Sequence, residues 1–283
     1  MKILVLGASG MLGNAMLRVM SAQEGWSVFG TVRGADPALH AAAPRAVLIP
    51  GVHADQPDSL LAAFAQARPD VVINCVGLVK QLSNAEDPLV AVPINTLLPH
   101  RLARMCEVAG ARLVHVSTDC VFSGKQGNYT EFDLADAQDV YGRSKLLGEV
   151  DYQHAVTLRT SIIGHELRSA HGLIDWFLSQ QTPVKGYTEA VFSGLPTCEL
   201  ARVVRDFVIP HANLRGVYHV AAEPISKYDL LQLVNRVYGK ALEIEPDDRL
   251  KIYRSLNAER FREMAGYVAP SWPELVARMH DFG

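Results

Sequence analysis

The sequence contains few cysteines, little net charge and no long apolar run. Its 283 residues include four cysteines, none of them in the C-x-x-C spacing of a zinc or redox site, which indicates reduced thiols. The net charge of −3 provides no general attraction for nucleic acid or an anionic membrane. No apolar run approaches the length of a membrane span, and a glycine motif that begins at Gly7 leaves no room for a targeting segment. These absences predict a cytoplasmic protein without a membrane or nucleic-acid partner.

The first half of the chain alternates apolar runs with helical patterns. Strands are expected at residues 2–6, 26–32, 46–49, 71–75, 112–117 and 155–159, and helices at 11–23, 60–67, 88–108 and 141–151. Such alternation is typical of a parallel, doubly wound sheet, in which ligands bind at the carboxyl ends of the strands. We therefore predict an α/β protein of the Rossmann type.

A glycine motif joins the first expected strand to the first expected helix. Gly7 allows a sharp turn off the strand, Gly10 allows the backbone to approach a pyrophosphate, and Gly13 allows the helix to pack against the sheet. The amides at the start of the helix then face an anionic ligand. This context predicts a dinucleotide site, and the residues expected to bind the cofactor there are Gly7, Ser9, Gly10, Met11 and Leu12.

The pattern of strands and helices loosens after residue 160. We expect residues 1–160 to form the dinucleotide-binding domain, with a segment near 192–220 returning to its sheet. Residues 161–191 and 221–283 are expected to form a smaller substrate-binding lobe. The second ligand would then occupy the cleft between the two parts.

Three side chains in the middle of the chain suit the transfer of a proton to a carbonyl oxygen. Tyr141 and Lys145 share one helix face because they are four residues apart. A neighbouring ammonium lowers the pKa of a phenol, so Tyr141 is expected to exchange a proton near neutral pH. Thr118, at the end of the preceding strand, can donate a hydrogen bond to the same oxygen. Together they suit hydride transfer between a nicotinamide and a carbonyl carbon.

The chain resembles the extended short-chain dehydrogenase/reductase superfamily and, within it, the dTDP-4-dehydrorhamnose reductases. The resemblance rests on the glycine motif at 7–13, Val-Ile-Asn-Cys-Val-Gly at 72–77, Ser-Thr-Asp-Cys-Val-Phe-Ser-Gly at 117–124 and Tyr-Gly-Arg-Ser-Lys at 141–145. It implies that Thr118, Tyr141 and Lys145 are catalytic and that Lys145 also holds the nicotinamide ribose. It adds further residues to the expected cofactor site, namely Asn74, Cys75, Val76, Gly77, Asn95 and Ser117.

The end of the second expected strand bears on the choice of cofactor. It carries Arg33 and lacks the acidic residue that would bind an adenosine ribose diol. An arginine can pair with the 2′-phosphate of NADP instead. We therefore expect NADP(H) rather than NAD(H).

The resemblance implies a nucleotide-sugar substrate, and the reaction expected is NADPH-dependent reduction of the 4-keto group of a 4-keto-6-deoxy nucleotide sugar. Cations would meet the diphosphate and aromatic side chains would cover the sugar. The residues expected to line the substrate site are Lys80, Cys120, Phe122, Ser161, Trp176, Lys185 and Arg254. No metal site is expected, and a homodimer is considered possible.

Three alternatives remain open at this stage. GDP-fucose synthases carry a cysteine two residues beyond the catalytic hydroxyl, and Cys120 stands in that register, with His171 as a partner from the other lobe; the enzyme would then epimerise the sugar before reducing it. A nucleotide-sugar 4-epimerase would recycle its cofactor without net oxidation. Some relatives of the rhamnose reductases bind NADP as regulatory subunits of another enzyme, which would make the chain non-catalytic.

Overall fold

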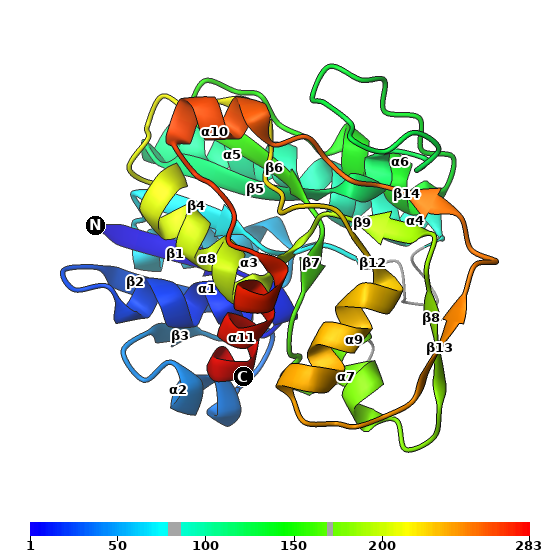
Figure 1. Ribbon diagram of the computed structural model, residues 1–283. Coiled ribbons are helices and arrows are strands. Elements are labelled where there is room, and N and C mark those ends of the chain that lie inside the picture. The colour runs from blue at the N-terminus through cyan, green and yellow to red at the C-terminus, as the bar shows by residue number, and fades with distance from the viewer. Residues whose placement is uncertain (79–85, 169–171) are drawn as a thin grey trace.

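A computed structural model describes residues 1–78, 86–168 and 172–283, and its centre is a parallel sheet (Figure 1). The sheet has seven strands in the order β11-β6-β5-β4-β1-β2-β3, and every neighbouring pair is parallel. The strands are β1 (Lys2–Leu6), β2 (Ser27–Thr31), β3 (Val47–Ile49), β4 (Val71–Asn74), β5 (Arg112–Thr118), β6 (Ala155–Thr160) and β11 (Gly216–His219). This arrangement confirms the predicted Rossmann-type fold. The strand order reverses between β1 and β4, which is where such sheets bind ligands.

Helices cover both faces of the sheet, because successive residues of its buried strands point to opposite sides. In β1, Ile3 and Val5 belong to one hydrophobic core, and Leu4 and Leu6 belong to the other. The first core includes helices α1 (Met11–Ala22), α8 (Thr197–Val203) and α11 (Trp272–Phe282), and the second includes α3 (Pro57–Ala67) and α5 (Leu98–Ala109). The sheet is therefore buried on both faces, as its apolar strands predict.

The expected helix at 88–108 consists of three segments in the structure. They are α4 (Pro88–Ala91), the π-helical segment η1 (Val92–Leu97) and α5. The π-helical segment contains Pro93, which has no amide hydrogen to donate to the helix. Asn95 lies in this segment, and its side chain is buried. π-Helical turns of this kind are frequent at functional sites.

Three small sheets lie beside the main one, on the side where Figure 1 shows α9 and β8. β7 (Ile162–Ile163) pairs with β10 (Leu195–Pro196), β8 (Val184–Tyr187) pairs with β13 (Ile244–Asp247), and β9 (Ala190–Phe192) lies between β12 (Ile225–Ser226) and β14 (Ile252–Tyr253). The helices that accompany them are α7 (Leu173–Ser179) and α9 (Lys227–Val237), whereas α10 (Glu259–Ala265) packs against β11 of the main sheet. The division into two domains stays a prediction, although β11 does return to pair with β6.

Sequence patterns missed several short elements. These are the helices α2 (Pro37–Ala42) and α10, the 3₁₀ turn η2 (Asp119–Val121), and most strands of the three small sheets. All four cysteines are free. Among the described residues, no helix is long and apolar enough to cross a membrane.

Candidate active site

The glycine motif forms a tight turn from β1 into α1. Gly7 has a φ of +75°, a left-handed conformation that glycine adopts without strain. A Cβ atom on Gly13 would lie 2.0 Å from the carbonyl oxygen of Gly7, so only a glycine allows the helix to approach the turn this closely. Gly10 is the N-cap of α1, and no side chain caps that end. The first amides of the helix are therefore not taken by a side-chain cap, which suits an anionic ligand.

The loop after β4 is held by two asparagine side chains. Asn74 accepts a hydrogen bond from the Val76 amide at 3.1 Å. Asn95 accepts one from the Leu78 amide at 2.9 Å and donates one to the Ser144 hydroxyl at 3.1 Å. Asn95 thus connects the loop to α6 (Val140–Leu147).

This loop lies beside the lysine of α6. A Cβ atom on Gly77 would be 3.7 Å from the Lys145 ammonium and 3.5 Å from the Asn95 oxygen. Three sequence-predicted cofactor residues from three separate elements therefore meet at one place. Cys75 and Val76, in the same loop, are half-buried.

The three expected catalytic residues converge at the carboxyl end of β5. The Thr118 hydroxyl accepts a hydrogen bond from the Cys120 amide at 3.1 Å and donates one to Asp119 at 3.2 Å. Tyr141 and Lys145 lie one turn apart on α6, whose N-cap is Asp139. The Lys145 ammonium donates a hydrogen bond to the Val116 carbonyl at 2.8 Å, so the helix and the strand end are joined.

Burial sets the protonation of both α6 residues. It lowers the pKa of Lys145 to about 8, against the opposing charges of Glu149 and Cys75. It raises the pKa of Tyr141 above its usual value, and the charge of Cys120 adds to this, while a hydrogen bond with Thr118 opposes it. The expectation that Lys145 brings the pKa of Tyr141 near neutrality is therefore wrong for this structure: desolvation dominates. The phenol is held in its protonated form, which is the form of a proton donor.

The adenosine end of the expected cofactor site is more open. Arg33 follows β2 and is exposed. Sequence reasoning did not single out Asp36, a buried carboxylate that caps α2 through the Leu39 amide and pairs with Arg168 at 2.6 Å. No sequence signal marks this pair, because its partners are distant in the chain.

The substrate residues predicted from the sequence have different surroundings. Arg254 donates hydrogen bonds to the Phe122 carbonyl at 3.0 Å and to the Cys120 sulfur at 3.6 Å, so it lies near the catalytic strand end. The Phe122 ring is fully buried and stacks on Tyr129 with centroids 4.2 Å apart, and it does not line a cleft.

For the other predicted substrate residues that are described, the structure gives their exposure but no contact with the catalytic residues. Ser161 is half-buried, Trp176 is 37% exposed on α7, and Lys185 is exposed on β8. Lys80 and His171 lie outside the described residues.

Cys120 and its neighbours form a cluster of charged groups that the sequence did not reveal. Burial, with a contribution from the charge of Asp119, raises the pKa of the Cys120 thiol to about 12, so it is protonated at neutral pH. A protonated thiol is not a base, which does not favour epimerisation through Cys120. Burial lowers the pKa of Lys227, while the charges of Asp119 and Cys120 oppose this shift. Lys227 therefore faces the same cluster, although it begins a helix more than a hundred residues later.

No group of three or more potential metal ligands occurs among the residues that the structure describes. The strand order, the glycine turn at the N-terminus of α1 and the meeting of Thr118, Tyr141 and Lys145 define a class of protein. This is the class of Rossmann-type dinucleotide-binding proteins.

Comparison with known families and proteins agrees with this class. The chain belongs to the RmlD substrate binding domain family, whose model matches residues 1–279. It is 33% identical over 180 residues to a dTDP-4-dehydrorhamnose reductase of Mycobacterium tuberculosis, a match that covers 55% of each chain. It thus spans about half the length of that relative.

Two further similarities cover more of the chain. It is 27% identical over 258 residues to methionine adenosyltransferase 2 subunit beta of Danio rerio, covering 81% of this chain and 71% of that one. A dTDP-4-dehydrorhamnose reductase of Bacillus anthracis in complex with NADP superposes with a TM-score of 0.78 over the whole of both chains, at 19% identity. The structural match supports the fold.

Proposed function

We propose that the protein is an NADPH-dependent reductase that converts the 4-keto group of a 4-keto-6-deoxy nucleotide sugar to a hydroxyl. The observation that carries this proposal is the meeting of Thr118, Tyr141 and Lys145 beside the loop that follows β4. The named activity of the Mycobacterium tuberculosis relative supports the class of substrate.

The residues present fit a dinucleotide. The α1 N-terminus has no side-chain cap, and the missing Cβ of Gly13 lets it lie against the turn. The amides of Met11 and Leu12 would hold the pyrophosphate, and Lys145 would hold the nicotinamide ribose. When bound there, the cofactor supplies a hydride.

The chain's own residues would bind and protonate the carbonyl oxygen of the substrate. Tyr141, whose pKa is raised by burial, donates the proton that the new hydroxyl needs. Thr118 positions the oxygen by a hydrogen bond, and the ammonium of Lys145 favours the phenolate that remains. Because Lys145 has a pKa of about 8, it loses this charge as the pH rises above that value.

The preference for NADPH rests on Arg33. Its exposed guanidinium lies at the end of β2 and is free to meet a 2′-phosphate with charge-assisted hydrogen bonds. We expect Arg33→Ala to weaken NADPH binding about tenfold while NADH binding changes little. Fluorescence titration of the two cofactors measures this, and equal losses for both would contradict the assignment.

The proposed reaction is tested by following NADPH oxidation with a panel of 4-keto-6-deoxy nucleotide sugars that differ in nucleotide and sugar. Turnover of at least one of them is the expected result. The similarity to methionine adenosyltransferase 2 subunit beta over 81% of the chain supports a second candidate, a regulatory subunit. NADPH binding without turnover of any sugar, together with a copurifying enzyme, would favour that candidate. Analytical ultracentrifugation distinguishes a homodimer from a monomer.

A further inference from the structure

A buried ion pair lies directly behind the catalytic end of β5. Glu149, just beyond α6, receives two hydrogen bonds from the Arg159 guanidinium of β6, each 2.7 Å long. It also accepts one from the Ser117 hydroxyl at 2.8 Å. The side chains of Glu149 and Arg159 are each 7% exposed. Removing one partner of such a pair leaves a buried charge uncompensated, so the two positions depend on each other.

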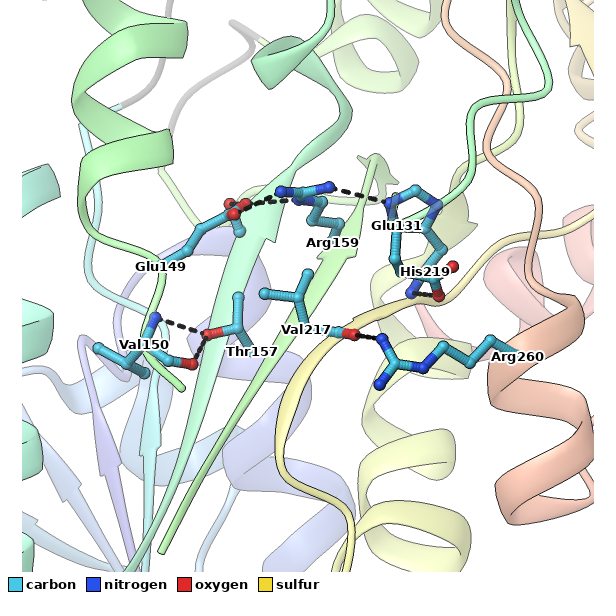
Figure 2. A network of polar contacts seen from close by, with 9 residues as sticks. Glu131, Glu149, Val150, Thr157, Arg159, Val217, His219 and Arg260 are labelled. Carbon is cyan, nitrogen blue, oxygen red and sulfur yellow. Dashed lines mark hydrogen bonds and ion pairs between the residues drawn. The ribbon is translucent and has the colours of Figure 1, made fainter. Parts of the chain in front are cut away.

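Arg159 is held from its other side as well. Figure 2 shows it between Glu149 and His219, and its guanidinium lies 3.3 Å from His219 Nε2. Since arginine only donates, this imidazole nitrogen accepts, and His219 Nδ1 donates to the Tyr129 carbonyl at 3.0 Å. Burial and the charge of Arg159 lower the pKa of His219 to about 3, so the ring is neutral. Arg159 therefore contacts a neutral ring on one side and its anionic partner, Glu149, on the other.

The Glu149 carboxylate reaches the catalytic groups through the last residues of β5. Ser117, which it binds, directly precedes Thr118. Val116, on the other side of Ser117, accepts the hydrogen bond of Lys145. One carboxylate thus anchors the strand end that presents the Thr118 hydroxyl and receives the Lys145 ammonium.

Glu149 is also the negative charge that Lys145 faces. Burial lowers the pKa of Lys145, and the charges that oppose this shift are those of Glu149 and, second, Cys75. Burial raises the pKa of Cys75 to about 12 and lowers that of His115 well below its usual value, so both are neutral at pH 7. Tyr141 is neutral as well, because its pKa is raised. Among these described titratable neighbours, the Glu149 carboxylate is the one negative charge left to stabilise the ammonium.

We propose that Glu149, fixed by Arg159, is a positioning residue that holds the Ser117–Thr118 strand end and keeps Lys145 in its charged, strand-bound state. The functional consequence rests on the proposed reduction, in which Thr118 and Lys145 act. The effect on Lys145 itself can be measured without any substrate.

The first test is Glu149→Gln, which retains the size of the side chain and an acceptor for Ser117 but removes the charge. NMR titration of the protein labelled with ¹³C-lysine, without substrate, reports the pKa of Lys145. We expect it to fall by about one unit, which is the lower end of the effect of a nearby opposite charge. An unchanged Lys145 titration would overturn the proposal.

Glu199→Gln is the matched control. Glu199 is a buried carboxylate of α8 that binds Arg278 at 2.7 Å. Its loss should destabilise the protein without moving the titration of Lys145. An equal shift in both variants would assign the effect to general loosening of the fold and would also overturn the proposal.

Ser117→Ala tests the anchoring of the strand end separately from the effect of the Glu149 charge on Lys145. It can also be used if Glu149→Gln does not fold. It removes one hydrogen bond to Glu149 and leaves the ion pair in place. We expect kcat to fall about fivefold, the effect of a hydrogen bond of about 1 kcal/mol, with the Lys145 titration unchanged. An unchanged kcat would contradict the anchoring role.

Turnover provides a second readout of Glu149→Gln. The alkaline limb of the pH–rate profile of this variant should move to lower pH by the same amount as the Lys145 titration. Its activity should approach that of the wild type near about pH 6. A loss that is equal at every pH would indicate structural damage and count against the proposal. If the wild type reduces no nucleotide sugar, the proposed function fails, while the titration still decides the role of Glu149.

Discussion

The first 160 residues and the last third of the chain differ in what determines their structure. In the first region, the strands β1, β2, β5 and β6 have five to seven residues and carry apolar runs. In the last third, strands such as β12 and β14 have two residues each, and both pair with β9, far from them in the sequence. The first region is encoded locally, and the second depends on tertiary contacts. The candidate chemistry lies in the first, and substrate selection is expected to involve the second.

The largest expected effect is on kcat, when a catalytic residue of the first region is substituted. We expect Tyr141→Phe to lower kcat about a thousandfold, because it removes the proton donor while keeping the ring. NADPH binding, measured by fluorescence, should remain close to that of the wild type. The matched control, taken from beyond residue 160, is Trp176→Phe, also an aromatic exchange, at a position 37% exposed on α7. It should leave kcat within about threefold. Turnover by Tyr141→Phe close to that of the wild type would remove the assignment.

The second prediction tests whether a local sequence motif, the glycine turn, determines the structure of the first region. In Gly13→Ala the new Cβ would meet the Gly7 carbonyl at 2.0 Å, and neither backbone segment can move aside cheaply. We expect the free energy of unfolding to fall by about 3 kcal/mol, with loss of cofactor binding. Gly34→Ala is the control, because a Cβ there would meet nothing within 4 Å. It should change stability by less than about 0.5 kcal/mol in urea unfolding. Similar losses in both variants would contradict the close-packing role of Gly13.

The degree to which the sequence predicted the structure follows the same division. The residues of β1 were predicted to within the strand's own bounds, and the main sheet strands to within one or two residues, because long apolar runs of a parallel sheet dominate their surroundings. The helix at 88–108 was predicted as continuous, but it contains a π-helical turn that places Asn95 against Ser144. That turn depends on a contact across the fold, which a helical pattern does not encode.

In the candidate site, too, the sequence did not predict contacts between distant parts of the chain. Thr118, Tyr141 and Lys145 were found because their spacing and order carry the chemistry. Glu149 and Arg159 were not singled out, because a buried ion pair between a helix end and a strand has no sequence pattern. The expected effect of Lys145 on the pKa of Tyr141 was wrong for a related reason. Spacing shows that two groups are near, but the depth of burial, which dominates here, is a property of the folded chain.

The third prediction concerns acid stability and involves a histidine from each side of the comparison. Burial lowers the pKa of His115 in β5 and that of His219 in β11, the latter to about 3. Below about pH 6.5 the unfolded chain binds a proton that the folded ring does not, so stability is lost as the pH falls. Each ring contributes about 1.4 kcal/mol per pH unit, over a window that for His219 extends down to about pH 3.

Urea unfolding between pH 7 and pH 5 measures this slope. His219→Gln should make stability less dependent on pH by about one proton, at the cost of lower stability at pH 7. His40→Gln, at an exposed position in α2, is the control and removes no buried ring. If the slope of His219→Gln equals that of the wild type, the neutral, buried state of this ring is contradicted.

The smallest expected effect concerns the part of the chain beyond residue 160, where the sequence proposed two cations for the substrate, Lys185 and Arg254, and the structure distinguishes between them. Arg254 reaches the Cys120 sulfur and the Phe122 carbonyl beside the catalytic strand end, whereas Lys185 is exposed on β8. Arg254→Ala should raise KM for the nucleotide sugar about tenfold, the effect of one charge-assisted hydrogen bond, with a smaller change in kcat. Lys185→Ala should leave KM within about twofold. The reverse order of effects would place the substrate on the β8 side, away from the Arg254 and Cys120 pair.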